Sequence, residues 1–516
     1  MIVSSRFRSY SVDYDGSFPS FLFDYVKLFA EKPALIDPDN DDFLTFEELS
    51  RNVFECSERL AQLGVQKTDV IGTLCGNSIE FIVLSLAVCH VGAVFSPLNP
   101  AYKQDEIVKY INQISAKWIF TEQIYLRKVM ECKERFSNVK EIIDLNGFAE
   151  KRNAPIFDEN IQRVDDVSNT AMIFFSSGTT GLPKGVCLSH RSLIAHVHLI
   201  SSINSDPSTP MPHIASADRI FGVLPYFHAG GLLTVYCLLS QGTTVYINKI
   251  FKEDHFFNTI LKHNITVLNV VPPILNVLMR GLDKLQSLRL VLVGASQVNQ
   301  DTVSSLRQML PGVTFTELYG LTEVGILALM SPLHTKPHTT GVLMPGFQCQ
   351  LVGGELWFRS ATAMSGYLDP EQTREAIAND GWIRSGDLGD VDEDGYFSII
   401  GRLKELIKVR GWQVSPKELE DALSSSFPDK VHECCVIGVP DERAGELPKA
   451  FIVLKKEAKL NEQEIHRVVN EKFISYKHLK GGIQFVDHIP KNPSGKVNRH
   501  RLAHEYNEPT NAGRSA

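Results

Sequence analysis

Short apolar runs alternate with segments of helical periodicity through the first two-thirds of the chain. The apolar runs lie at residues 171–175, 221–224, 243–247, 266–271 and 290–293, and helical patterns such as 256–263 and 301–310 lie between them. Runs that are apolar at nearly every position are typical of parallel strands covered by helices on both faces. The pattern therefore predicts an α/β fold with a large N-terminal domain of layered sheets.

The longest apolar stretch covers residues 81–95 and is interrupted only by Ser85 and His90. A bilayer-spanning helix needs about 20 apolar residues, so this stretch is too short to cross a membrane. We expect a buried helix here and no transmembrane segment.

After Gly341 the alternation of predicted strands and helices gives way to short strands joined by turns. Predicted strands at 348–352 and 355–358 flank Gly353-Gly354, and a second turn precedes a strand at 396–400, which indicates a small antiparallel β unit. Residues 401–411 are charged and bounded by glycines, and we interpret them as a junction. Beyond it, helices at 416–423 and 463–473 and strands at 434–439 and 451–454 predict a small α+β domain. We expect an N-terminal domain at 1–401, a hinge at 402–404 and a mobile C-terminal lid at 405–516.

Composition and net charge exclude several classes of protein. The chain has 516 residues, 43% of them apolar, and a net charge of −8, which excludes a disordered or fibrous chain and offers no global basic field for nucleic acid. Its nine cysteines show no metal-binding spacing and indicate a reducing compartment. Arg6 and Arg8 only faintly resemble a transit peptide, and the last residues are not a peroxisomal tripeptide. We expect a cytoplasmic location, with a mitochondrial one as the alternative, and assign no oligomeric state.

A glycine-rich loop follows the apolar run at 171–175. Glycine lets backbone N–H groups approach an anion, hydroxyls add rotatable donors, and a lysine supplies a point charge for phosphate. A Walker A loop is excluded, because Pro183 stands where its second glycine is needed and Gly185 follows the lysine. We predict a phosphate-binding loop of another kind, formed by Ser176, Ser177, Gly178, Thr179, Thr180, Gly181 and Lys184.

This loop resembles the signature of the adenylate-forming superfamily, which includes acyl- and aryl-CoA synthetases, firefly luciferase and peptide-synthetase adenylation domains. Five further motifs stand in the order of that family. They are the segment from Pro225 to Gly231, Tyr319-Gly-Leu-Thr-Glu323, Ser385-Gly-Asp387, the hinge motif from Gly401 to Lys408, and the loop from Pro490 to Lys496. The resemblance covers essentially the whole chain, with Ser385 where the family has threonine.

The resemblance implies roles for particular residues in binding ATP and Mg²⁺. Glu323 and Thr179 would bind the metal, Thr322 the α-phosphate, and Asp387 the ribose hydroxyls, while Lys496 would stabilise the charge that builds on the transferred phosphate. The remaining predicted nucleotide contacts are Gly294, Ala295, Glu317, Leu318, Tyr319, Gly320 and Arg402. Taken alone, Tyr319 could equally be a core aromatic and Lys496 a solvated loop lysine.

The acyl and CoA sites are also inferred from the resemblance. His228, Ala229 and Gly230 would border the acyl pocket, although a satisfied core histidine is an open alternative for His228. Lys408, Arg410, Gly411, Trp412 and Gln413 would line the face used in the second reaction, and Lys404 would be the hinge residue. Leu318 stands where aryl-CoA ligases often have glycine, which puts transfer of aryl specificity in doubt.

These inferences predict an ATP- and Mg²⁺-dependent acid:CoA ligase that forms acyl-AMP and then acyl-CoA. Only 20 residues follow Lys496, so we expect free CoA rather than a fused carrier domain, and a separate acyl-carrier protein is the alternative acceptor. A non-catalytic nucleotide-binding protein is disfavoured because the hydroxyl loop, Glu323 and Lys496 are all present. Fatty, branched and aryl acids all stay open as substrates.

Overall fold

The computed structural model describes residues 2–149, 164–176, 183–206, 208–296, 298, 300–334, 336–337, 339–491, 496–499 and 501–503. The predicted loop residues Ser177, Gly178, Thr179, Thr180 and Gly181 lie outside these ranges. The chain forms two compact units. The first comprises Met1–Gln350 and Trp357–Ser385, and the second Leu351–Leu356 and Gly386–Ala516. The structure therefore groups residues 386–401 with the C-terminal unit, whereas the hinge at 402–404 stays a prediction.

The first unit contains a mostly parallel sheet that carries the predicted phosphate loop. Its strands run in the order β19 (Gly366–Tyr367), β9 (Lys184–Ser189), β8 (Thr170–Ser176), β5 (Val94–Pro97), β4 (Val70–Leu74), β6 (Trp118–Thr121) and β7 (Glu141–Asp144). Strands β8 and β9 pair antiparallel, so that Ser176 lies opposite Lys184. Both ends of the predicted phosphate loop are therefore fixed on adjacent strands.

The second sheet of this unit also has a parallel centre. Its order is β16 (Gly341–Leu343), β15 (Gly325–Met330), β14 (Thr314–Leu321), β13 (Leu290–Val293), β12 (Val267–Val270), β10 (Arg219–Gly222), β11 (Thr244–Ile247), β2 (Pro33–Ile36) and β3 (Phe43–Thr45). Strands β14 to β2 are parallel along this path, and β15, β16 and β3 are antiparallel. At the N-terminus, β1 (Ile2–Ser4) pairs with β17 (Gln348–Val352).

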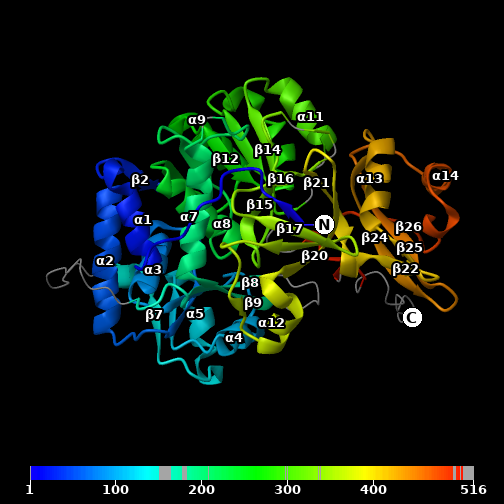
Figure 1. Cartoon of the computed structure of the whole chain (residues 1–516). Coiled ribbons are helices and arrows are strands. Elements are labelled where there is room, and N and C mark those ends of the chain that lie inside the picture. Colours follow the sequence, from blue (N-terminus) through cyan, green and yellow to red (C-terminus); the bar gives the residue numbers. More distant parts are fainter. Residues whose placement is uncertain are drawn as a thin grey trace, which may run out of the picture. The chain divides into compact units, whose positions relative to one another are not determined.

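Helices of the first unit pack between and over these sheets (Figure 1). A central group comprises α1 (Phe18–Val26), α2 (Phe46–Gln62), α3 (Ile79–His90), α7 (His190–Asn204) and α8 (Ala229–Ser240). Helices α3 and α7 contact strands of the first sheet, α2 and α8 contact strands of the second, and α1 packs against the other four helices. The others are α4 (Gln104–Gln113), α5 (Gln123–Met130), α6 (Leu145–Ala149), α9 (Glu253–His263), α10 (Pro272–Leu278), α11 (Gln300–Met309) and α12 (Pro370–Ala376). Thr45 and Glu48 form a capping box that starts α2, because each side chain satisfies a backbone N–H of the other. The layered α/β prediction is thus confirmed.

The apolar run at 81–95 departs in part from its prediction. Its first part lies in α3, which is buried from Phe81 to His90, but Phe95 belongs to the buried strand β5. Gly92, at a φ of +75°, lies in the turn between the two. Periodicity cannot separate a buried helix from a buried strand, so the turn was hidden within the apolar run. Among the described residues, no helix is both long and apolar enough to cross a bilayer.

The second unit is α+β, as predicted. It contains residues 386–391 of β20 (Ile383–Val391), which pair antiparallel with β21 (Tyr396–Arg402), and the Gly353-Gly354 turn that joins β17 to β18 (Glu355–Arg359). A further sheet has the order β23 (Trp412–Val414), β22 (Ile407–Val409), β25 (Gly445–Leu454) and β24 (Val431–Asp441), with β26 (Gly482–Phe485) beside β25. Helices α13 (Pro416–Ser426) and α14 (Glu462–Lys472) pack over an apolar core that includes Leu419, Val436 and Ile465.

The segment interpreted as a junction contains regular secondary structure. Part of it forms β22, which makes a hairpin with β23. Arg410 and Gly411 form the two-residue turn at φ values of +52° and +84°. Positive φ at both central residues is the conformation that matches the twist of paired strands, and glycine adopts it without steric cost.

Candidate functional site

Glu323 is the centre of a polar cluster in the first unit. It lies in the turn between β14 and β15, where its backbone oxygen accepts a hydrogen bond from the Met364 N–H at 2.9 Å. Its Oε1 accepts two further hydrogen bonds, from Ser176 Oγ at 2.8 Å and from the Tyr367 hydroxyl at 2.9 Å. The cluster therefore joins the predicted metal-binding carboxylate to the first residue of the predicted phosphate loop.

Lys184 stands at the other end of that loop, as the first residue of β9. Its Nζ lies 4.8 Å from the centroid of the Tyr367 ring, within the range of a cation–π contact. Among the ion pairs of the described residues, none joins Lys184 to Glu323. A cation and a carboxylate thus share one aromatic neighbour without pairing with each other.

Tyr367 was not predicted from the sequence. No motif marks it, because its position beside Glu323 depends on β19 pairing with β9 across a long chain separation. Burial raises the pKa of its phenol, and the charge of Glu323 raises this pKa further. The phenol therefore remains protonated near neutral pH and can donate its hydrogen bond to Glu323.

His196 on α7 is a second residue that the sequence did not reveal. Its Nδ1 lies 2.6 Å from the Ser192 carbonyl oxygen, and its Nε2 accepts from the Ile326 N–H at 3.4 Å. These bonds require the neutral ring with a proton on Nδ1, and burial lowers the pKa of His196 to about 4. The imidazole therefore ties α7 to the strand that follows Glu323.

Two segments of predicted nucleotide contacts lie at the ends of neighbouring parallel strands. Gly294 and Ala295 follow β13, while Glu317, Leu318, Tyr319 and Gly320 belong to β14. A Cβ on Gly294 would lie 2.7 Å from the Leu318 carbonyl oxygen, so only glycine allows the two chains to approach so closely. Carboxyl ends of parallel strands are common ligand sites in open α/β sheets. Thr322 is half-buried in the turn beside Glu323.

His228 caps a helix. It is the N-cap of α8, and its Nδ1 accepts a hydrogen bond from the Gly230 N–H at 3.2 Å. Gly231 packs closely against the preceding turn, since a Cβ there would lie 2.1 Å from the Pro225 carbonyl oxygen. The segment around Ala229 is therefore shaped by a local cap and a close backbone approach, and a role for His228 in the acyl pocket stays a prediction.

The predicted site residues of the second unit lie in two places. Asp387 on β20 is buried and faces Arg402 on β21, with Asp387 Oδ1 3.0 Å from Arg402 Nε. Lys408 and Gln413 are exposed and directly opposite each other in the β22–β23 hairpin, so their side chains share one face. Trp412, 61% exposed, stacks on Tyr476 with ring centroids 5.2 Å apart.

Lys496 is half-buried and directly precedes Val497, which pairs with Lys491 in an isolated antiparallel β-bridge. The nearby Arg499 is held by Glu420 at 2.6 Å and by Glu405 at 3.0 Å. Glu405 directly follows the predicted hinge residue Lys404. Ion pairs within the C-terminal unit thus link the segment that follows Lys496 to the residue directly after the predicted hinge.

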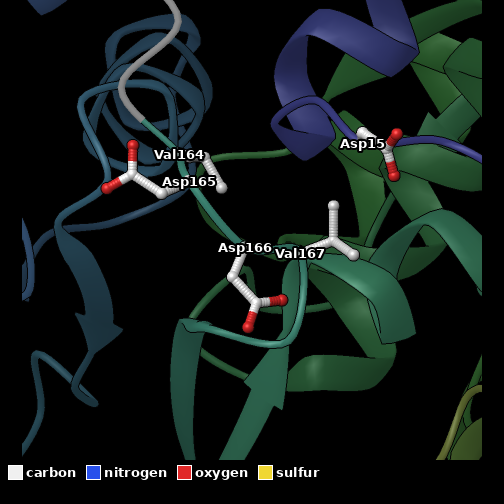
Figure 2. Close-up of a pocket in the computed structure, with 5 residues that line it drawn as sticks. All are labelled: Asp15, Val164, Asp165, Asp166 and Val167. Carbon is white, nitrogen blue, oxygen red and sulfur yellow. The ribbon is translucent and has the colours of Figure 1, made fainter.

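A hollow of about 530 Å³ elsewhere in the first unit has different chemistry. Figure 2 shows its lining of Asp15, Asp165, Asp166, Val164 and Val167. Its described lining residues carry three carboxylates, of which Asp165 pairs with Lys67 Nζ at 2.6 Å, and a lining dominated by carboxylates disfavours the phosphates of a nucleotide. We therefore place no nucleotide in this hollow.

Comparisons with known proteins agree with the geometry. The model of the family described as "AMP-binding enzyme" matches residues 22–368, and the model of its C-terminal domain matches residues 418–496. A 4-coumarate–CoA ligase of Solanum tuberosum is 32% identical over 94% of this chain and 92% of its own length. A peroxisomal OPC-8:0-CoA ligase of Arabidopsis thaliana is also 32% identical, over 91% of this chain and 90% of its own.

Solved structures share the fold. The ATP-bound MatB of Rhodopseudomonas palustris is 25% identical, with a TM-score of 0.84 over 96% of this chain and 99% of its own. An anthranilate CoA ligase in complex with anthranoyl-AMP has the same TM-score at 24% identity, over 96% of this chain and 98% of its own, and supports the fold alone. The order of the motifs, the layered α/β architecture and the two family matches agree. The chain belongs to the AMP-binding enzyme family, the adenylate-forming ligases.

Proposed function

We propose that this protein is an acid:CoA ligase that works in two half-reactions. In the first, a carboxylate oxygen attacks the α-phosphorus of ATP and pyrophosphate leaves, which gives an acyl-adenylate. In the second, the thiol of CoA loses its proton and attacks the acyl carbon, and AMP leaves with the electrons of the broken C–O bond. The curated relatives named above are CoA ligases, and ATP and CoA are the co-substrates of that group of ligases.

The observation that carries the proposal is the cluster at Glu323. Ser176 and Lys184 bracket the predicted phosphate loop, and the carboxylate beside them receives two hydroxyl donors on one oxygen. Anionic phosphates need cationic and hydrogen-bonding groups, and their charge is reduced further by a divalent cation. The cluster has this composition: a lysine, hydroxyls and one carboxylate.

Mg²⁺ fits the chemistry of this donor set. Mg²⁺ prefers oxygen ligands and is commonly held by one or two carboxylates together with substrate phosphates. Among the described residues, no group of three or more metal-binding side chains is present, which suits such a site better than a cage built by the protein alone. When bound, the cation would neutralise charge on the phosphates of ATP. Glu323, with Thr179 as the second predicted ligand, would hold it.

The other residues are proposed to divide the two reactions between them. Asp387 and Arg402 would bind the ribose, and Lys496 would offset the charge on the oxygens of the transferred phosphate. Lys408, Arg410, Gly411, Trp412 and Gln413 would serve the second reaction, since the hairpin exposes polar groups on one face. Lys496 and the β22–β23 hairpin belong to the same C-terminal unit but would serve different reactions. This unit would therefore have to reorient between the two steps.

Free CoA is the proposed acceptor. The relatives that match over most of their length are named as CoA ligases, whereas the alternative, a separate acyl-carrier protein, has no supporting feature on the chain. Names of relatives include an aryl acid and OPC-8:0, so the class of acid is left to experiment. Leu318, half-buried at the end of β14, is expected to shorten or redirect the acyl pocket.

The test uses purified protein and a panel of aryl, branched and fatty acids. Exchange of labelled pyrophosphate into ATP should depend on the carboxylic acid and should not require CoA. Addition of CoA should then yield a thioester of the expected mass together with AMP. Absence of acid-dependent exchange across the panel would refute the first half-reaction, and exchange without a CoA thioester, but with acylation of an added carrier protein, would refute the proposed acceptor.

A further inference from the structure

Tyr367 is fixed by backbone hydrogen bonds to β9. The Ser365 N–H donates to the Cys187 carbonyl oxygen at 2.9 Å, and the Leu368 N–H donates to the Gly185 carbonyl oxygen at 2.8 Å. Gly185 lets Leu368 approach closely, since a Cβ there would lie 2.4 Å from the Leu368 side chain. The strand that begins with Lys184 thus determines where the Tyr367 side chain lies.

The hydroxyl and the ring face of the Tyr367 side chain each contact a charged residue. Its hydroxyl donates to Glu323 Oε1 at 2.9 Å, and the face of its ring lies 4.8 Å from Lys184 Nζ. An aromatic face attracts an ammonium without neutralising its charge, and a phenol binds a carboxylate without contributing a formal charge. A direct ion pair between Lys184 and Glu323 would instead occupy both groups with each other.

We propose that Tyr367 is a positioning residue for adenylation, which orients Glu323 toward a divalent cation and Lys184 toward phosphate while keeping the two from pairing. The inference rests on the proposed function, because it deepens the role of the Glu323 cluster. Ser176 acts beside it, since its hydroxyl donates to the same oxygen and the two bonds together set the orientation of the carboxylate. The other oxygen of Glu323, Oε2, would then be the one left to bind the cation.

The first experiment measures cation binding without any reaction. The full-length protein is titrated with Mn²⁺ in the presence of a non-hydrolysable ATP analogue, and free Mn²⁺ is followed by electron paramagnetic resonance. Tyr367→Phe keeps the ring and removes the donor, so the Mn²⁺ concentration at half-saturation should rise about tenfold. Tyr14→Phe is the matched control, because its phenol also donates to a carboxylate, Asp24 at 3.3 Å, outside the cluster.

A second variant separates the ring from the hydroxyl. Tyr367→Leu removes both, so it should weaken binding of the ATP analogue even at saturating Mn²⁺, by a further several-fold beyond Tyr367→Phe. Thermal unfolding of each variant shows that the fold is kept. Half-saturation in Tyr367→Phe equal to that of the wild-type protein would overturn the inference, as would equal analogue affinity in the two Tyr367 variants.

Different results would overturn the proposed ligase function and the proposed role of Tyr367. Titration with Mn²⁺ and the analogue needs neither a carboxylic acid nor CoA, so it tests Tyr367 even if the acid panel gives no exchange. Exchange in the wild-type protein with an unchanged titration in Tyr367→Phe would instead sustain the ligase function and reject the positioning role.

Discussion

Arg402 Nε lies 3.0 Å from Asp387 Oδ1, and the two residues face each other in the register of β20 and β21. The side chain of Asp387 is 4% exposed, whereas that of Arg402 is 29% exposed. The arginine therefore holds the orientation of a buried carboxylate from its more open side. Asp387, predicted to bind the ribose, and Arg402, predicted to contact the nucleotide, are thus arranged as a pair on adjacent strands.

The first prediction concerns this pair. Asp387→Asn should weaken ATP binding about tenfold or more, since a hydrogen bond to a charged group contributes roughly 1.5–3 kcal/mol. Calorimetric titration with ATP and Mg²⁺ measures the change. Asp390→Asn is the matched control, because Asp390 lies exposed on the same strand and should bind ATP like the wild-type protein. Equal affinity in the two variants would contradict the ribose assignment.

The second prediction separates the two half-reactions. Lys496→Ala should lower acid-dependent pyrophosphate exchange by about 100-fold or more, because a preorganised charge on the transferring group is lost. Lys408→Ala should leave exchange nearly intact and lower thioester formation. Lys491→Ala serves as the control, since this lysine pairs with Glu433 at 3.0 Å and has no assigned role. Equal loss of both activities in Lys408→Ala would rule out the division of labour.

The third prediction concerns pH. Burial lowers the pKa of both His190 and His196 to about 4, below the ordinary value of 6.5. The unfolded chain therefore binds more protons than the folded one between about pH 6.5 and 4, and stability falls as pH decreases through that range. Each histidine contributes roughly 3 kcal/mol that is present above pH 6.5 and lost by about pH 4.

Urea unfolding measured from pH 7 to pH 4 checks this sign. His196→Gln removes one titrating group, so the variant should start less stable at pH 7 and lose less stability on acidification. A slope of unfolding free energy against pH identical to that of the wild-type protein would show that His196 is not held neutral by burial.

The fourth prediction concerns the core of the second unit. Arg499 is held by Glu420, whose side chain is 12% exposed, and by Glu405. Arg499→Met should destabilise this unit by about 3–5 kcal/mol, because it leaves a nearly buried carboxylate without its partner. Hydrogen exchange of the amides in β24 and β25 should accelerate accordingly. Arg501→Met, at an exposed position two residues further along the chain, should change stability by less than about 0.5 kcal/mol.

Strand and helix positions could be predicted well wherever an apolar run had turn residues on both sides. The run at 290–293 coincides with β13, and 348–352 coincides with β17. The run at 221–224 was less accurate, since β10 covers Arg219–Gly222 and the polar Arg219 still takes part in the ladder. A strand can end with a polar residue where its edge reaches solvent, and an apolar pattern does not record this.

Local motifs were enough to identify the candidate phosphate-binding residues, because glycines, hydroxyls and a lysine close together in the chain bind phosphate by local chemistry. The partners of those residues were decided by tertiary structure. Tyr367 lies far from both Lys184 and Glu323 in sequence, and only the pairing of β19 with β9 brings its phenol to the carboxylate. His196 likewise acquires its role from the packing of α7 against β15. Spacing along a chain reports contacts within one helix or loop, whereas contacts between strands depend on register, which forms only when the sheets assemble.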